Sequence, residues 1–383
     1  MGIERKTSVQ SIVKGLLITS VIYFHATLFV ALPNHLTALN EFNILHSLFP
    51  FLMMVFFFYA GYNYIPEKRT FGQNIKRRSL QLLIPLVASY IFSTLIIIAI
   101  KVPNGESWEA IKNALLYCLM SEPLALMIGF PSNGIFCFDL ALALGILWFL
   151  YALFIISIFF YLLVDYAIKK PAILFSIIVG LLLLAFALGE FVGIYLPYTV
   201  QCYPVGLAMM LLAAYLKKFN FLDCKIETKK DLIINIINVI VAEGVVVSIS
   251  LFGYFKFGST MIGSLPGGQF DQYIKGFDAF VSFVVGFLGV YVLHQTSRII
   301  NRIPGVAFVL DWYGQYSSYV YLLHPICLSF VHTVMFGQQK LVGDFQPYLY
   351  TFITIGMLVV IFIIADLVIL KIKKRKAPEE ATA

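Results

Sequence analysis

Two residues in the first apolar stretch have the types and the spacing to carry chemistry. The segment 11–32 is about as long as a bilayer-spanning helix, yet it contains Lys14 and His25. An ionisable side chain within a membrane span is costly, and by default it faces a protein interior or a wet cavity and has a function. Eleven positions are close to three helical turns, so both side chains share one face, roughly 16 Å apart along the axis.

His25 has two interpretations. A lone buried histidine often does no more than hydrogen bond to the backbone of a neighbouring helix. The second interpretation is a general base, because removal from water disfavours the charged imidazole and leaves a neutral ring that can accept a proton. Lys14 on the same stripe favours the second interpretation, in which His25 takes a proton from a hydroxyl.

A second group of candidates is the basic cluster Lys76-Arg77-Arg78 in KRRSLQLLIP, residues 76–85. Such a cluster can simply anchor a helix end at an anionic lipid surface. It can also bind a phosphorylated ligand, because guanidinium groups hold phosphate oxygens in a two-pronged fork. The chain contains no GxxxxGK[ST] motif, so this is no phosphate loop.

Three further polar or aromatic residues lie in apolar runs. Trp148 belongs to LWFLYALF and suits either helix packing or an aromatic belt at the membrane interface. His324 precedes Pro325, where we expect a helix break. Glu243 lies near the middle of an apolar segment, where lining a cavity and simple packing are equally open. We treat all three as candidates for substrate binding or structure.

The composition limits the classes of protein. Sixty per cent of the 383 residues are hydrophobic and 12% are charged, against roughly 25% charged in soluble domains, which indicates an integral membrane protein. We expect no nucleic-acid partner despite the net charge of +7, because the basic residues lie in short loops between apolar runs. The five cysteines have no metal-binding spacing, and HExxH, GxSxG and dinucleotide-binding motifs are absent from the sequence. We expect no metal.

The elements that must position these residues are about ten membrane-spanning helices. The apolar runs predict an all-α polytopic protein with one membrane domain over residues 1–373 and a short polar tail over 374–383. Of the 27 Lys and Arg residues, all but Lys101, Lys112, Lys256, Lys275 and Lys340 fall on the side of the N-terminus, so both termini are expected in the cytoplasm of a cell inner membrane. The predicted spans are 10–32, 44–65, 80–101, 138–164, 171–190, 197–216, 231–254, 276–296, 316–337 and 347–371.

Four segments in this order resemble the acyltransferase 3 family of integral membrane acyltransferases. They are KGLLITSVIYFHA, FFFYAGYNYI followed by KRRSLQLLIP, LWFLYALF and YSSYVYLLHP. The resemblance runs from Lys14 to about His324. It implies an enzyme that transfers an acyl group, with acetyl expected, from cytoplasmic acyl-CoA to a hydroxyl of a cell-surface or lipid-linked glycan.

The resemblance also assigns roles to residues. Family members usually carry a basic residue and a histidine in the first span, which Lys14 and His25 match, with lysine where arginine is usual. The family histidine is the expected catalytic base, so His25 receives that role. The family Arg-x-x-Arg element aligns with Arg78 to Gln81, so its second basic residue is missing here. Donor binding is therefore expected at Lys14, the neighbouring Lys76-Arg77-Arg78 cluster and Gln81.

The fourth span separates branches of that family. Members that acetylate O-antigen often carry Trp-Ser-Leu-x-x-Glu, whereas this chain has Trp148 through Leu153 with no acid. This resembles the stand-alone branch of sugar acetylases and exopolysaccharide-modifying proteins. Two alternatives remain: a transporter of glycans, lipid intermediates or small solutes that does no chemistry, and a structural subunit of a polysaccharide synthase. Neither the acceptor nor the oligomeric state follows from the sequence.

Overall fold

All regular elements that the structure describes are helices. The computed structural model describes residues 7–34, 51–66, 68–102, 105, 107–109, 112, 148–191, 203–222, 227–251, 276–331 and 346–380. The expectation of an all-α protein is confirmed for this part of the chain. The segments 102–137, apart from a few positions, and 255–275, which connect predicted spans, lie outside it, and so does the side chain of Trp148.

Each of the ten predicted spans overlaps at least one described helix. The helices are α1 (Val9–Asn34), α3 (Leu52–Tyr62), α4 (Phe71–Arg78), α5 (Ile84–Lys101), α9 (Trp148–Ala167), α10 (Pro171–Phe191), α11 (Tyr203–Leu216), α12 (Lys229–Leu251), α14 (Gly276–Ile300), α15 (Pro304–Gln315), α16 (Ser317–Phe330) and α17 (Gln346–Glu380). Six of them are long and apolar enough to cross a membrane by length and composition. The number ten and the orientation of the termini stay predictions. The helix α17 continues to Glu380, past the predicted end of the last span and into the predicted tail.

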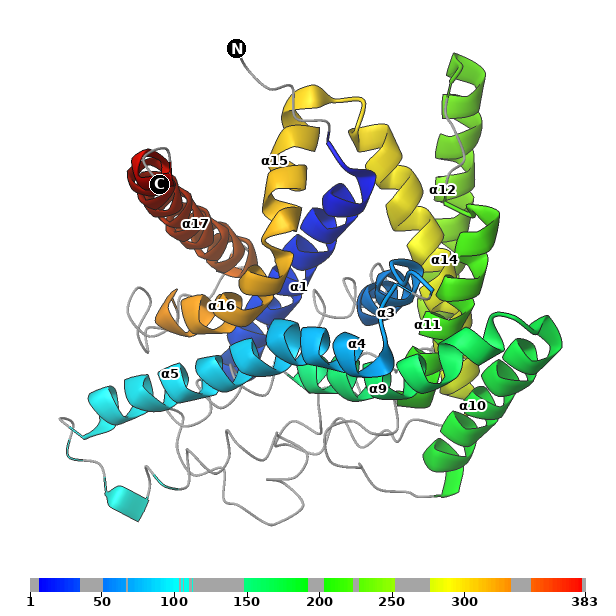
Figure 1. Cartoon of the computed structure of the whole chain (residues 1–383), viewed down its shortest axis with the longest axis horizontal. Helices are drawn as coiled ribbons and strands as arrows, with labels where there is room; N and C mark the ends of the chain where they lie inside the picture. Colours follow the sequence, from blue (N-terminus) through cyan, green and yellow to red (C-terminus); the bar gives the residue numbers. More distant parts are fainter. Residues whose placement is uncertain are drawn as a thin grey trace.

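The helix α1 lies at the centre of the bundle. It packs most closely against α15, along which it runs in Figure 1, and it also contacts α17, α14 and α16. A second packed group joins α3 to α11 and α14. The buried core is correspondingly aliphatic and aromatic, and Phe51, Phe57, Phe58 and Phe160 are completely enclosed. Lys14 and His25 therefore lie on a helix that is packed on several sides.

The outer helices leave large apolar side chains exposed. Ile91 on α5, Leu183 on α10, Ile240 on α12 and Phe352 on α17 are each more than half exposed. Rows of such residues on a water-facing surface would be unfavourable, whereas lipid chains cover them without cost. The distribution supports a membrane protein whose polar groups are gathered inside.

The crossing of α1 and α15 depends on two glycines. A Cβ added at Gly15 would overlap the carbonyl of Leu310, and one added at Gly314 would overlap the carbonyl of Ser11. Ser11 and Gly15 lie four positions apart on one face, the spacing of small residues that lets membrane helices approach closely. At the beginning of α1 the backbone N–H of Ser8 donates to Oδ1 of the buried Asp311 (2.9 Å).

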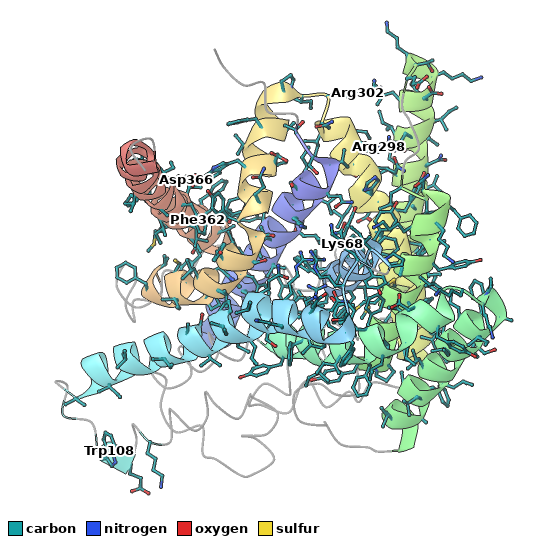
Figure 2. The ribbon with its side chains drawn as sticks, in the orientation of Figure 1. Lys68, Trp108, Arg298, Arg302, Phe362 and Asp366 are labelled. Carbon is teal, nitrogen blue, oxygen red and sulfur yellow. The ribbon has the colours of Figure 1, made fainter. Side chains whose placement is uncertain are left out.

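The ninth predicted span, 316–337, is not divided within the residues that the structure describes: a division lies at its first residue, and α15 falls before it, between the eighth and ninth predicted spans. The division falls at Tyr316, between α15 and α16, whereas Pro325 lies inside α16. The predicted break before Pro325 is therefore wrong. The hydroxyl of Tyr316 donates to Oδ1 of Asp366 (2.5 Å) and its ring stacks on Phe362, residues that Figure 2 labels on α17. A hydrogen bond and a ring contact thus hold the division in place.

Candidate functional site

His25 pairs with His324 in the interior of the bundle. Nδ1 of His25 lies 2.9 Å from Nε2 of His324, and the two rings are nearly parallel, with centroids 5.1 Å apart. His25 is 6% exposed and His324 is fully enclosed. The two histidines that the sequence singled out separately therefore form one unit.

The hydrogen bonds define which nitrogens carry protons when both rings are neutral. Nδ1 of His324 lies 3.1 Å from the carbonyl of Val320, which can only accept, so that nitrogen carries the proton. Nε2 of His324 then has a lone pair and accepts from Nδ1–H of His25. Nε2 of His25 consequently carries a lone pair. This is the arrangement of a general base oriented by a second group.

Pro325 contributes to the orientation of His324. A proline has no N–H, so within α16 it cannot bond the carbonyl four residues earlier, which belongs to Tyr321. That carbonyl interacts with the ring of His324 instead. The proline thus does not end the helix, and it leaves a second acceptor beside the histidine.

Aromatic rings surround the histidine pair. The ring of Phe24 meets His25 edge-on at 5.6 Å, and Tyr321 lies 5.5 Å from His324. Phe149 of α9 packs against Tyr321 in turn, with ring centroids 5.7 Å apart. A buried, largely apolar surrounding keeps water away from the pair, and a dry site strengthens electrostatic interactions during a reaction.

The N-terminal part of α1 lies near one member of the second group of candidates. Lys14 is half-buried, and the guanidinium of Arg78 lies within electrostatic range of its ammonium. Nε of Arg78 donates to the hydroxyl of Tyr161 on α9 (3.0 Å). The structure thus brings together two of the basic residues that the sequence assigned to donor binding, and they come from helices far apart in sequence.

The rest of the basic cluster points outward. Lys76, Arg77 and Gln81 are exposed, and they are not drawn into the group around Lys14. A capping box at Thr70 begins α4 so that the three basic residues fall in its last turn, where cations favour the helix dipole.

A π-helical turn follows α4. It covers Ser79–Leu83 directly before α5, where Pro85 cannot bond the carbonyl of Gln81. The backbone N–H of Ile84 reaches back five residues to Ser79 instead of four. Turns of this kind are frequent at functional sites.

Glu243 contributes to neither group. It is half-buried on α12, which packs mainly against α14, and its Oε2 is buried with no hydrogen-bond partner among the described residues. Trp148 begins α9, but its side chain lies outside the described residues. Both remain candidates. No group of three or more His, Cys, Asp or Glu residues able to hold a metal occurs in the part of the chain that the structure describes.

Sequence reasoning missed a third buried histidine. Nε2 of His294 lies 3.0 Å from the carbonyl of Leu222, and the hydroxyl of Tyr59 lies 2.7 Å from its Nδ1. Arg298, labelled at the end of α14 in Figure 2, donates to the same carbonyl. Protein groups hold both ring nitrogens of His294, so this histidine joins α3, α14 and the segment that follows α11. Only its position in an otherwise apolar run could have signalled it.

Comparisons with known proteins agree with the resemblance in the sequence. A family model described as an acyltransferase domain matches residues 11–366, nearly the whole chain. No curated protein and no solved structure matches the chain significantly.

Proposed function

The chain belongs to this acyltransferase family, and we propose that it moves an acyl group, acetyl foremost, from cytoplasmic acyl-CoA to a hydroxyl of a cell-surface or lipid-linked glycan. The proposal includes the stand-alone sugar acetylase and exopolysaccharide-modifying branch of the family. It also includes an inner-membrane location with both termini in the cytoplasm. No metal takes part in the proposed reaction.

The observation that carries the proposal is the 2.9 Å contact between Nδ1 of His25 and Nε2 of His324. Acyl transfer to a hydroxyl needs a group that removes the hydroxyl proton as the oxygen attacks. A neutral histidine whose second nitrogen is held by another group has the orientation and the lone pair for this task, and such a base typically contributes about 10²–10⁴-fold to the rate. Nε2 of His25 is the atom we assign to it.

In the direct form of the proposed reaction, one proton moves from the acceptor to His25 and then to the leaving group. Nε2 of His25 takes the proton of the acceptor hydroxyl, and the oxygen attacks the thioester carbonyl carbon. The carbon–sulfur bond breaks, the ester remains on the acceptor, and the CoA thiolate takes the proton back from His25. Nδ1 of His25 stays bonded to His324 throughout, so the imidazolium that forms keeps its position. In an acyl-enzyme variant of the mechanism, a protein group receives the acyl group first.

Donor binding is proposed for the cytoplasmic end of the face of α1 that carries Lys14 and His25. Lys14 and Arg78 are close enough to interact electrostatically, and two cations near each other favour an anion such as the phosphates of CoA. The exposed Lys76, Arg77 and Gln81 would approach those phosphates from the cytoplasmic side. The pantetheine arm of the donor spans the distance from this cluster to His25, and the glycan enters from the outer side or from the lipid.

A transfer assay tests the proposal directly. Membranes that contain the wild-type chain or His25→Ala, at equal protein levels, receive labelled acetyl-CoA and the glycan extracted from the host. We expect label in the glycan fraction with the wild type and none with the variant. Label retained on the wild-type protein would indicate an acyl-enzyme. Absence of transfer with both acetyl and succinyl donors would contradict the proposal.

A transporter is the second candidate, and one observation favours it. The helices α15 and α16 follow each other directly with a break at Tyr316, and discontinuous helices are common at transporter binding sites. A transporter without chemistry does not need an imidazole at position 25. Glycan or solute movement that persists in His25→Gln, together with no acyl transfer by the wild type, would favour this candidate.

A further inference from the structure

Arg78 is held by a neutral hydroxyl and not by a carboxylate. Its Nε donates to the hydroxyl of Tyr161 at 3.0 Å. Within the described residues no carboxylate forms an ion pair with Arg78 or with Lys14. An arginine has five N–H donors, and the Nε bond commits one of them and fixes the plane of the group. The four Nη donors form the fork that binds phosphate oxygens.

Tyr161 is itself held in place by its neighbours. Its ring packs against the ring of Tyr64, with centroids 5.9 Å apart, and against Phe160 at 5.5 Å. The hydroxyl of Tyr64 donates to Oδ1 of Asp165 (2.6 Å). Tyr161 and Asp165 lie one turn apart on α9, so one face of this helix presents a hydroxyl to Arg78 and a carboxylate to Tyr64.

Tyr64 is also fixed through its backbone. Nζ of Lys217, just past the end of α11, donates to the carbonyl of Tyr64 (2.8 Å). The ring of Tyr64 meets Phe160 edge-on at 5.4 Å, and its side chain is only 8% exposed. The segment that follows α3 is thus tied to α9 and α11, and it supports the ring on which Tyr161 rests.

Because the hydrogen-bond partner of Arg78 is the neutral hydroxyl of Tyr161, it does not cancel the charge of the guanidinium. A carboxylate beside Arg78 would cancel its positive charge and compete with any anion for the Nη donors. A phenol hydroxyl orients the guanidinium and leaves the charge intact. The only carboxylate on this face of α9, Asp165, accepts a hydrogen bond from Tyr64. Within the part of the chain that the structure describes, the positive charges of Lys14 and Arg78 are therefore not cancelled by a carboxylate and can act on a ligand.

We propose that Tyr161 is a positioning residue that orients the Arg78 guanidinium toward the phosphates of the acyl-CoA donor. In this proposal Tyr64 and Asp165 hold the side chain of Tyr161 in place. This inference rests on the proposed function, because it concerns the donor site of that reaction. Tyr161 touches neither the reacting atoms nor the histidine pair in this scheme, so it acts on donor binding and not on the chemical step.

The test uses the full chain in lipid nanodiscs, with coenzyme A as the binding probe and acetyl-CoA for turnover. Tyr161→Phe removes only the hydroxyl. A hydrogen bond to a charged group contributes enough that its loss weakens binding about ten- to hundredfold, so we expect increases of that size in the Kd of coenzyme A and the KM of acetyl-CoA. The value of kcat at saturating donor should stay within about twofold of the wild type, because chemistry at His25 is untouched.

The matched control is Tyr166→Phe on the same helix. The ring of Tyr166 is exposed and lies beneath Nζ of Lys170, so the loss of its hydroxyl should leave both constants unchanged. In Arg78→Lys the Nε donor is absent, so adding Tyr161→Phe should cause little further loss. That coupling distinguishes orientation of Arg78 from general destabilisation.

The outcomes separate the two proposals. If the wild type binds coenzyme A and Tyr161→Phe binds it equally well, the positioning role is wrong while the donor site stands. If Tyr161→Phe lowers kcat and leaves KM unchanged, the role is also wrong, because the hydroxyl then acts on the chemical step. Failure of the wild type to bind coenzyme A would overturn the proposed donor and this inference with it.

Discussion

Nδ1 of His25 on α1 is hydrogen bonded to Nε2 of His324 on α16 at 2.9 Å, although the two residues lie 299 positions apart in the chain. The other nitrogen of His324 donates to the carbonyl of Val320. Because a carbonyl can only accept, this bond also determines that His25 donates to His324. The first span and the ninth therefore meet at a pair in which one histidine orients the other. Three predictions about activity and one about stability follow from this arrangement and its surroundings.

His25→Gln should abolish acyl transfer while the protein still folds. Glutamine is similar in size and can still donate a hydrogen bond to His324, but it cannot accept the proton of a hydroxyl. We expect kcat to fall by about 10²–10⁴-fold, the usual contribution of a general base. The measurement is transfer from labelled acetyl-CoA, with protein amount and thermal unfolding compared in parallel. Full activity in this variant would remove His25 from the chemistry.

Substitution at His324 should lower kcat less than substitution at His25 does, because His324 only orients His25. The size of the loss should depend on the replacement residue. The side-chain oxygen of glutamine can accept from Nδ1–H of His25, whereas leucine offers no acceptor. His324→Leu should therefore lower kcat by about 5–100-fold, the effect of losing one buried hydrogen bond, and His324→Gln should recover part of the rate. The KM of the donor should not change in either. Equal rates in the two variants would argue against a role for the hydrogen bond.

The sequence was sufficient for the helical class and for the residues of α1. Lys14 and His25 share a helix because a period of 3.6 residues decides which side chains lie on one face, and the long apolar runs required membrane helices. Helix limits were less predictable. Pro325 lies inside α16 although it has no N–H to bond the carbonyl four residues earlier, and no local pattern indicates that the helix continues through it.

The site itself depended on contacts between distant segments. His324 stood out alone in the sequence, but its pairing with His25 depends on how α1 packs against α15 and α16. Tyr161 could not be singled out among 22 tyrosines, because its importance comes from Arg78, which α4 places beside α9. The basic cluster was predicted as a unit, yet only Arg78 turns inward, since successive helical residues point about 100° apart.

The close crossing of α1 and α15 should make Gly314 intolerant of a side chain. A methyl group at Gly314 would overlap the carbonyl of Ser11, which belongs to the helix backbone and cannot move aside cheaply. We expect Gly314→Ala to reduce the free energy of unfolding by about 1–3 kcal/mol or more, measured by thermal unfolding in detergent. Gly356→Ala on α17 is the control, because an added Cβ there meets no described atom within 4 Å. Equal stability of both variants would mean that the helices are farther apart.

Lys14 should govern donor affinity through its charge and not through its particular shape. Lys14→Leu removes one of the two cations near the proposed phosphate site, so the KM of acetyl-CoA should rise by about tenfold, the loss expected for one charge-assisted contact. Lys14→Arg keeps the charge and should bind the donor at least as well, because a guanidinium holds phosphate in two places. Added salt screens exposed charges, so the KM of the wild type should increase with ionic strength more steeply than that of Lys14→Leu. A parallel salt dependence in the two proteins would show that Lys14 does not meet the anionic part of the donor, and the site would then have to be sought at Arg78 and the exposed cluster alone.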